Sequence, residues 1–399
     1  MARMWFRLAA LALLGGVGCA KDDGTLGSSL AKLAGWSDAP AWDGTCAVGT
    51  LVTAGDARYC ESNGQRVGNF RSTYPDDKPK AAGQFVADRE SDVWRYWHPN
   101  GAPAAIGAFA DGKRDAMWSS YYPNGQVESQ EGWAGGARQG ASKWFYSNGK
   151  PQRTASYTAG LLDGAYATFF VDGTAESATT YVGGKRQGAW KSYHDNGKLR
   201  EDGAYTNDLR TGAWTTYFDN GQLASTGSYV DDLKEGAWTT KNRDGSLDTE
   251  GSYVQGRGEG TWRRYFYGDE VPSFDEGQQV HGLAEGLWLG WSVDRQHKLT
   301  EVTYLHGLAE GPSTEWWVNG QKSAEGSYLV GAKEGPWVFY YDNGQKQGEG
   351  SYRLGLRTGA WTEWYSDGKL KSQGSYVEGD RTGTWTFYAT DGTPTTVTY

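Results

Sequence analysis

The segment G-A-W-T-T-Y-F-D-N-G-Q at 212–222 returns as G-P-W-V-F-Y-Y-D-N-G-Q at 335–345 and as G-A-W-T-E-W-Y-S-D-G-K at 359–369. A period of this size indicates a stacked array of one supersecondary unit. Repetition places identical residues at regular intervals along a surface and does not bring different residue types together in one pocket. The repeat alone therefore predicts no catalytic activity. The turn glycine recurs every 24 residues, at Gly101, Gly125, Gly149, Gly173, Gly197, Gly221 and Gly245, and again at Gly320, Gly344, Gly368 and Gly392.

The composition argues against an aliphatic core. Only 38% of the 399 residues are hydrophobic, and Ile106 is the single isoleucine. The bulk comes instead from 20 tryptophans and 25 tyrosines, which accompany 59 glycines. This mixture is typical of short twisted strands in which aromatic rings lie over glycines.

Each unit contains two turn signals, an Asn-Gly or Asp-Gly pair in the middle and a second Gly-rich step between units. Two turns in 24 residues predict two strands, for example Trp214–Phe218 and Leu223–Tyr229. Pro99 and Pro123 stand just before Asn-Gly, which favours a type I turn followed by a glycine bulge. We therefore expect an all-β protein, an elongated single-layer antiparallel meander of tandem 24-residue hairpins with ~26 strands over 85–399.

The expected register decides which side chains share a face. It pairs Tyr217 with Leu223 and predicts Tyr217, Leu223 and Tyr229 on one face and Trp214 on the other. In a single-layer sheet, stability comes from rings on neighbouring strands, at ~0.5–1.5 kcal/mol per aromatic pair. The predicted columns are Trp190, Trp214, Trp238, Trp262, Trp337, Trp361 and Trp385 on one face, and Tyr193, Tyr217, Tyr265, Tyr340, Trp364 and Tyr388 on the other.

The N-terminus reads as a secretory signal. Arg3 and Arg7 precede an apolar run that is too short to span a bilayer core of ~30 Å as a stable helix. The Gly18-Cys19 junction resembles a bacterial lipoprotein signal, which implies that Cys19 becomes the lipidated, for example palmitate-bearing, first residue of an envelope protein. Plain secretion, or retention of the segment, is the alternative.

Cys46 and Cys60 remain as a pair, and in an exported chain they predict a disulfide. A bridge of this loop length would contribute ~3 kcal/mol to stability. Two free thiols are the alternative. The expected organisation is a signal peptide at 1–18, a tether at 19–42, a disulfide-capped unit at 43–84 and an array of about 13 repeats at 85–399.

The charge and the motifs exclude several functions. The net charge of −9 argues against binding DNA, RNA or anionic lipid. No zincin, serine-hydrolase, Walker or Cys-x-x-Cys motif occurs, so we expect no catalytic residue, cofactor or metal. Two H-G-L-A-E-G copies place His281, Glu285, His306 and Glu310 an expected ~10 Å apart, too far for one metal ion. Basic residues such as Arg210 and the glutamates beside them are expected to serve solubility and to protect edges.

The pattern G-x-W-x-x-Y-x-x-N-G-x-x-x-x-x-G-x-Y resembles the MORN-variant repeat family, which occurs in bacterial lipoproteins and in antitoxin-like proteins. The resemblance covers about 85–399 and is interrupted where Ser142 and Ser313 replace the tryptophan, where Lys241 replaces the central tyrosine, and by an insertion in 266–300. It implies a non-enzymatic scaffold or interaction surface. Polysaccharide-binding repeats of cell-wall proteins are the nearest rival reading, an antitoxin-like binder is another, and an envelope enzyme is a further class.

A binding surface needs accessible rings with polar neighbours. The most regular stretch, 313–392, offers Trp316, Tyr340, Trp364 and Tyr388 in line, with Thr314, Thr362 and Thr386 on the same strand segments. We expect this column to bind an envelope protein or a glycan as a monomer, with membrane contact only through the lipid anchor.

Overall fold

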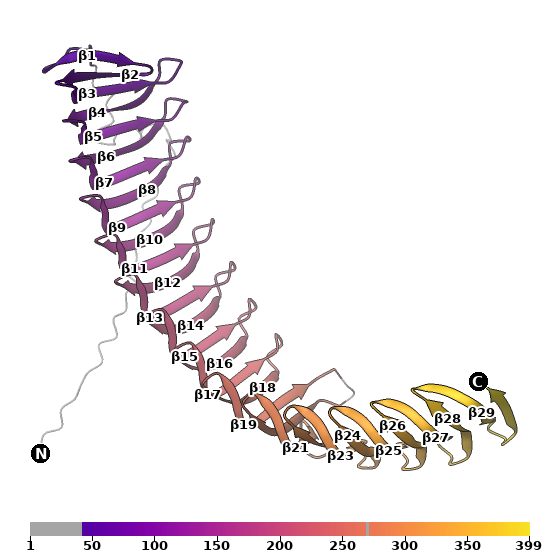
Figure 1. Cartoon of the computed structure of the whole chain (residues 1–399). Helices are drawn as coiled ribbons and strands as arrows, with labels where there is room; N and C mark the ends of the chain where they lie inside the picture. Colours follow the sequence, from indigo (N-terminus) through magenta and orange to yellow (C-terminus); the bar gives the residue numbers. More distant parts are fainter. Residues whose placement is uncertain (1–41, 269–270) are drawn as a thin grey trace, which may run out of the picture. The chain divides into compact units, whose positions relative to one another are not determined.

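The structure, a computed structural model, describes residues 42–268 and 271–399 as strands and turns, with no helix in these ranges. The chain divides into unit 1, the residues to Gly112 together with Tyr121–Gly125, and unit 2, Lys113–Ser120 and Gln126–Tyr399. The first strands, labelled in Figure 1, are β1 (Thr50–Ala54), β2 (Ala57–Ser62), β3 (Gln65–Thr73), β4 (Pro79–Val86), β5 (Arg89–Trp97), β6 (Pro103–Ala110) and β7 (Lys113–Tyr121). The strands that follow are β8 (Val127–Ala134), β9 (Ala137–Phe145), β10 (Pro151–Thr158), β11 (Leu161–Phe169), β12 (Ala175–Val182), β13 (Lys185–Tyr193), β14 (Leu199–Thr206), β15 (Leu209–Tyr217), β16 (Leu223–Val230), β17 (Leu233–Lys241), β18 (Leu247–Val254), β19 (Arg257–Phe266), β20 (Ser273–Val280), β21 (Leu283–Ser292), β22 (Lys298–Leu305), β23 (Leu308–Trp316), β24 (Lys322–Leu329), β25 (Ala332–Tyr340), β26 (Lys346–Arg353), β27 (Leu356–Trp364), β28 (Leu370–Val377), β29 (Asp380–Tyr388) and β30 (Pro394–Thr398).

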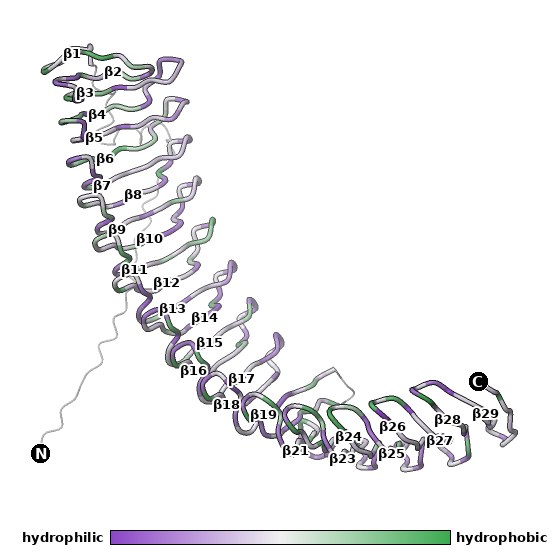
Figure 2. The backbone as a smooth tube through the Cα atoms, viewed as in Figure 1, coloured by the Kyte–Doolittle hydropathy of each residue, from purple (hydrophilic) through white to green (hydrophobic). Residues whose placement is uncertain are grey.

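The strands form a meander. Consecutive strands pair antiparallel from β1 to β6 and from β8 to β30. Figure 2 shows that hydrophobic residues recur hairpin by hairpin and do not gather in one core. The predicted all-β meander of tandem hairpins is confirmed, and the array over 85–399 holds β5 to β30.

The Asn-Gly turn is the predicted type I turn with a glycine bulge. The Gly221 N–H donates to the carbonyl of Phe218 at 2.8 Å, and the Phe218 N–H donates to the carbonyl of Gln222 at 2.9 Å. Gly221 has a φ of 89°, which glycine adopts without steric cost. As predicted, Tyr217 pairs with Leu223.

The turn between units is a two-residue type I′ turn, which needs positive φ at both central residues. Between the paired Leu329 and Ala332, for example, Val330 has a φ of 50° and Gly331 a φ of 80°. Positive φ is strained for a β-branched residue such as Val330.

A second bulge, which the sequence analysis missed, decides the faces. Beyond the Tyr217 pair the register shifts and leaves Ala224 as an extra residue in β16. The extra residue reverses the alternation, so Tyr229 lies on the face of Trp214, with ring centroids 5.9 Å apart. The prediction that Tyr229 shares the face of Tyr217 is therefore wrong, whereas Trp214 and Tyr217 do lie on opposite faces, as expected.

We call the face that carries the tryptophan column the indole face, and the opposite face the tyrosine face. On the indole face, Trp337 makes edge-to-face contacts with Tyr328 and Tyr352, at centroid distances of 5.3 Å and 6.2 Å. The predicted ring ladder is therefore confirmed on this face. The indole face bears Trp190, Trp214, Trp238, Trp262, Trp337, Trp361 and Trp385, and the tyrosine face bears Tyr193, Tyr217, Tyr265, Trp316, Tyr340, Trp364 and Tyr388.

Most indoles lie over a glycine of the preceding strand. A Cβ at Gly350 would stand 2.3 Å from the ring of Trp361, so no other residue fits there without a shift. The Trp361 Nε1–H donates to the Ser351 carbonyl at 3.1 Å, and this ring is only 2% exposed. The glycine beneath the ring, a neighbouring tyrosine and this hydrogen bond together bury the indole.

Two units depart from this arrangement in a compensating way. Where Ser313 replaces the indole, the glycine position in the preceding strand is Val302, and the two residues pair directly. Where Ser142 replaces the indole, the corresponding position is Glu131, again its direct partner. In both units the larger side chain stands on the preceding strand and the smaller one at the usual tryptophan position. The face therefore stays filled where the repeat pattern is interrupted.

Side chains at both edges tie each hairpin to the next. The Tyr341 hydroxyl donates to the Trp364 carbonyl at 2.9 Å, and the Asn343 side-chain amide donates to the Ser366 carbonyl at 2.8 Å. At the opposite edge, the Glu334 carboxylate accepts the backbone N–H of Leu354, a residue of the next type I′ turn, at 2.9 Å. The glutamate column thus has a structural role beyond solubility.

The basic column also packs within the fold. Lys333 Nζ lies 4.0 Å from the ring centroid of Trp337, and the Arg357 guanidinium lies 4.4 Å from that of Trp361. Such cation–π contacts contribute ~0.5–1 kcal/mol at exposed sites. They cover the outer surface of the indoles.

The predicted disulfide between Cys46 and Cys60 is present, with an S–S distance of 2.04 Å. The predicted signal peptide at 1–18 and Cys19 lie outside the described residues, as does nearly all of the tether at 19–42. The predicted domain boundaries stay predictions. Within the described ranges, no helix is long and apolar enough to cross a membrane.

Candidate functional site

The predicted column forms one row on the tyrosine face of unit 2. Trp316, Tyr340, Trp364 and Tyr388 are the last residues of β23, β25, β27 and β29, and each is half-buried. Successive members are separated by two strands, or ~10 Å. The structure therefore brings the four rings into line at the spacing of the repeat.

The predicted threonines share this face. Thr314, Thr362 and Thr386 each precede a ring by two residues on the same strand, and side chains two residues apart point to the same side. Hydroxyl groups therefore stand beside three of the four rings.

Lysine–glutamate pairs run beside the row. Lys322 Nζ lies 2.6 Å from a Glu325 carboxylate oxygen, and Lys346 Nζ lies 2.7 Å from one of Glu349. A third pair joins Lys298 to Glu301. The side chains of these pairs are about one-third to one-half exposed, so solvent screens them and each contributes ~0–1 kcal/mol to stability. They are better suited to offering hydrogen-bonding groups to a ligand than to holding the fold.

The lysines also contact the rings. Lys298 Nζ lies 4.6 Å from the ring centroid of Trp316, and Lys346 Nζ lies 5.9 Å from that of Trp364. Among the described residues, the four rings of the row make no ring-to-ring contact like those of the indole face. The predicted ring-to-ring contacts run along the indole face, whereas on the tyrosine face Tyr265 contacts Phe274, with ring centroids 5.4 Å apart.

Tyr340 is held by a carboxylate. Its hydroxyl donates to Glu325 at 2.6 Å. Burial and this acceptor raise the pKa of Tyr340 to about 12. Hydrogen bonds from Lys322 and then from Tyr340 lower the pKa of Glu325. The ring is thereby fixed in orientation with its hydroxyl protonated at neutral pH.

The lysine–glutamate pairs were missed by the sequence analysis, although their signal is present. K-L-T-E at 298–301, K-S-A-E at 322–325 and K-Q-G-E at 346–349 recur at the 24-residue step. On strands, residues three apart usually point to opposite faces, so the spacing conceals the pair. The bulge after the lysine brings both side chains to the tyrosine face.

The histidine loops differ from expectation in one respect. Glu285 and His306 are not ~10 Å apart; the His306 Nδ1 lies 3.7 Å from the Glu285 carboxylate, which also accepts the His306 backbone N–H at 2.8 Å. The glutamate reaches the next turn, just as Glu334 does elsewhere. Within the described residues, no group of three or more His, Cys, Asp or Glu side chains is arranged to hold a metal ion.

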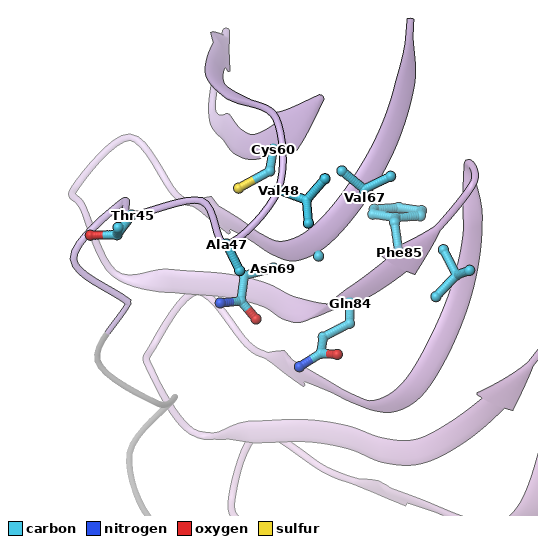
Figure 3. Close-up of a pocket in the computed structure, with 10 residues that line it drawn as sticks. Thr45, Ala47, Val48, Cys60, Val67, Asn69, Gln84 and Phe85 are labelled. Atoms are coloured by element: carbon cyan, nitrogen blue, oxygen red, sulfur yellow. The ribbon is translucent and has the colours of Figure 1, made fainter. Parts of the chain in front are cut away.

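Unit 1 contains a hollow of about 420 Å³ beside the disulfide. Figure 3 shows Val48, Val67 and Phe85 on its apolar side and the amides of Asn69 and Gln84 on its polar side. No residue of the predicted row lies here. This hollow is therefore a separate feature from the tyrosine face.

A meander of tandem hairpins with a ring ladder on one face defines a β-repeat protein. The family model of the MORN repeat variant matches six segments of the chain. These segments are MORN-variant repeats, and the resemblance expected from the sequence is confirmed. The matched residues are 114–132, 138–159, 186–207, 210–231, 333–353 and 357–378.

Other comparisons add little. None of the curated proteins matches the chain. Among solved structures, the crystal structure of TcdB2-TccC3 without its hypervariable C-terminal region is 11% identical, over 84% of this chain and 22% of that one, with a TM-score of 0.14. The crystal structure of TcdB2-TccC3-Cdc42 is 10% identical, over 82% and 22%, with the same TM-score. The chain spans less than a quarter of these proteins, and TM-scores this low support no inference from them.

Proposed function

We propose that this chain is a non-enzymatic scaffold of the bacterial cell envelope, anchored through a lipid on Cys19, whose tyrosine face binds an extended protein or glycan. The MORN-variant repeats support a repeat-based binding scaffold. The anchor and the envelope location rest on the signal at Arg3, Arg7 and Cys19.

The row of half-buried rings on the tyrosine face carries the proposal. Rings recur over 313–392, with hydroxyls beside three of them and lysine–glutamate pairs at 298–301, 322–325 and 346–349, so an extended ligand would meet similar groups at successive hairpins. Aromatic anchors with polar neighbours dominate recognition energies. On the indole face of the same hairpins, Trp337, Trp361 and Trp385 are buried, whereas the rings of the row stay partly exposed.

A glycan is the second candidate for the partner. Saccharides pack their C–H surfaces on aromatic rings and bond their hydroxyls to carboxylates and ammonium groups. Tyr340 with Glu325, and Trp364 with Lys346, present that combination. The net charge of −9 favours a neutral or basic partner surface over a phosphate-rich one.

The test is capture from envelope extracts and, separately, retention on purified peptidoglycan. We expect Tyr340→Ala with Trp364→Ala to lower partner recovery at least about tenfold, as loss of anchor residues does. The matched control is Tyr193→Ala with Tyr217→Ala, the same column positions in units that lack the lysine–glutamate pairs. Equal recovery by both double variants would reject the tyrosine face of 313–392 as the site.

Anchoring is tested by Cys19→Ser. We expect this variant to leave the detergent-extracted membrane fraction and to appear as a soluble or uncleaved form. Fractionation identical to that of the unchanged chain would rule out the anchor.

A further inference from the structure

A hollow opens on the indole face of unit 2. It measures about 230 Å³ and lies at Gly348 of β26, between Phe339 of β25 and Glu363 of β27. Both neighbours pair with Gly348 across the sheet. In several other hairpins this column is filled by bonded hydroxyl pairs, such as Thr216 with Ser225 at 2.7 Å. The hollow therefore exists because one side chain of the column is absent.

The fold does not require glycine at this position. Gly348 has no positive φ, and a Cβ built on it would meet only ordinary contacts, at 3.7 Å from the Thr362 carbonyl oxygen and 3.9 Å from Glu363. By contrast, a Cβ at Gly350 or Gly374 would collide with an indole at 2.3 Å or 2.2 Å. Among the strand glycines described in unit 2, Gly348 is the one that neither its conformation nor its neighbours demand. A space kept open without a packing reason points to a ligand.

The walls of the hollow combine one ring surface with fixed polar groups. Phe339 supplies the ring. The Arg357 guanidinium donates to the Tyr376 hydroxyl at 3.1 Å and lies 3.4 Å from the Glu363 carboxylate. Glu363 also accepts from the Ser372 hydroxyl at 2.9 Å. These bonds hold Arg357 and Glu363 in place, so the groups at the hollow are preorganised.

Two bulge residues stand at the opening. Gln347 and Lys371 are the extra residues of their hairpins, and both are exposed and line the hollow. Lys322 and Lys346, on the other face, are paired with glutamates. Among the described residues, Lys371 has no carboxylate partner. A lysine without a carboxylate partner at a hollow can pair with an anionic group on the ligand, and this local contact acts against the net charge of −9.

We propose that the Gly348 hollow binds one pyranose ring of an acidic saccharide. The volume of about 230 Å³ is below the ~300–1,000 Å³ of sites for drug-sized ligands, so it suits a single ring. Phe339 offers a surface for the C–H face of the sugar, Glu363 and Gln347 offer hydrogen-bond partners for its hydroxyls, and Lys371 pairs with its carboxylate. This site lies on the indole face, opposite the row of the proposed function, so it is independent of that proposal.

The experiment is calorimetric titration of the full chain with tetragalacturonate. Neutral maltotetraose and a tetraglutamate peptide serve as comparison ligands. Gly348→Leu fills the hollow where the backbone has room for a side chain, and we expect it to weaken tetragalacturonate binding at least about tenfold, with an unchanged melting temperature. Retention of tetragalacturonate binding in Gly348→Leu together with its loss in Tyr340→Ala would place the saccharide on the row of the other face and would overturn the proposal.

A charge-matched pair of variants gives an independent test. We expect Lys371→Ala to weaken binding about three- to tenfold, and Lys369→Ala, which removes the same charge from the neighbouring turn, to change it by less than about twofold. This pair decides the matter if Gly348→Leu lowers the melting temperature. Equal effects of the two lysine variants, equal binding of maltotetraose or tetraglutamate, or no binding of tetragalacturonate at millimolar concentration would each overturn the proposal.

Discussion

The two faces of the sheet between β24 and β29 carry the same aromatic residue types, but the rings are buried to different extents. On the indole face, Trp337, Trp361 and Trp385 are 1%, 2% and 0% exposed. On the tyrosine face, Tyr340 and Trp364 stay half-buried. The difference arises because a glycine floor and flanking tyrosines exist only under the indoles.

This comparison shows how a single-layer sheet can divide its tasks. The indole face buries rings against backbone and against other rings, and this provides most of the stabilisation available without a second layer. The tyrosine face can then expose rings beside screened ion pairs at little cost. Stabilisation by ring packing thus resides on the face opposite the row that we propose binds a partner.

The largest effect is expected from comparing Trp361→Ala with Trp364→Ala. The first removes a buried ring and leaves a cavity, so it should lower the free energy of unfolding by ~3–5 kcal/mol. The second removes a half-exposed ring and should cost roughly half of that or less. Urea unfolding measures both. Equal losses would show that the two faces contribute alike.

The next test compares Gly374→Ala with Gly348→Ala. A Cβ at Gly374 would stand 2.2 Å from the ring of Trp385, so the indole must shift, at a cost of ~1–3 kcal/mol. At Gly348 the added methyl group meets no clash and restricts the unfolded chain, so it should be neutral or stabilising by up to ~1 kcal/mol. Thermal unfolding distinguishes the two. Similar melting temperatures would contradict the indole-over-glycine account.

A third change leaves both faces intact and relieves the edge. Val330→Asn places a residue that tolerates positive φ in the type I′ turn, and we expect a gain of about 0.5–1 kcal/mol in unfolding free energy. Val377→Asn serves as the control, because Val377 is an exposed strand residue that directly precedes a later type I′ turn. This substitution should bring no gain in unfolding free energy. Loss of stability in Val330→Asn would mean that the exposed valine makes contacts that outweigh its strain.

The smallest effect concerns alkaline pH. The pKa of Tyr340 is raised from 10.0 to about 12 in the folded chain, first by burial and then by Glu325. Its contribution to stability is therefore fully present below pH 10 and is lost as pH rises towards 12, because the unfolded chain releases the proton first. We expect Tyr340→Phe to flatten the fall in melting temperature over this range, by a small amount because solvent screens the half-exposed pair. A fall as steep as that of the unchanged chain would rule out this linkage.

Local sequence rules predicted much of the molecule. The meander, the type I turn and the disulfide are present as expected. They were predictable because the 24-residue step and the Pro-Asn-Gly turns depend on residues close together in the sequence, and because Cys46 and Cys60 form a covalent cross-link. The row from Trp316 to Tyr388 also follows from the repeat, although its binding role stays a prediction.

Which face of the sheet a side chain occupies beyond a bulge was not predictable in this way. One extra residue at Ala224 moves Tyr229 to the other face, and nothing in the identity of an alanine signals the shift. The lysine–glutamate pairs were hidden for the same reason, since the bulge makes residues three apart share a face.

The sequence by itself determined the repeat, its two turns and its strand content, because glycine, proline and asparagine act through the conformation of their own backbone. Only the tertiary structure decided which strand glycines are covered by an aromatic ring and which are not. Gly348 and Gly350 stand two residues apart in the same strand, yet an indole from β27 covers Gly350 and no side chain covers Gly348 closely. That difference depends on where a neighbouring strand places its rings, so it exists only once the strands have paired.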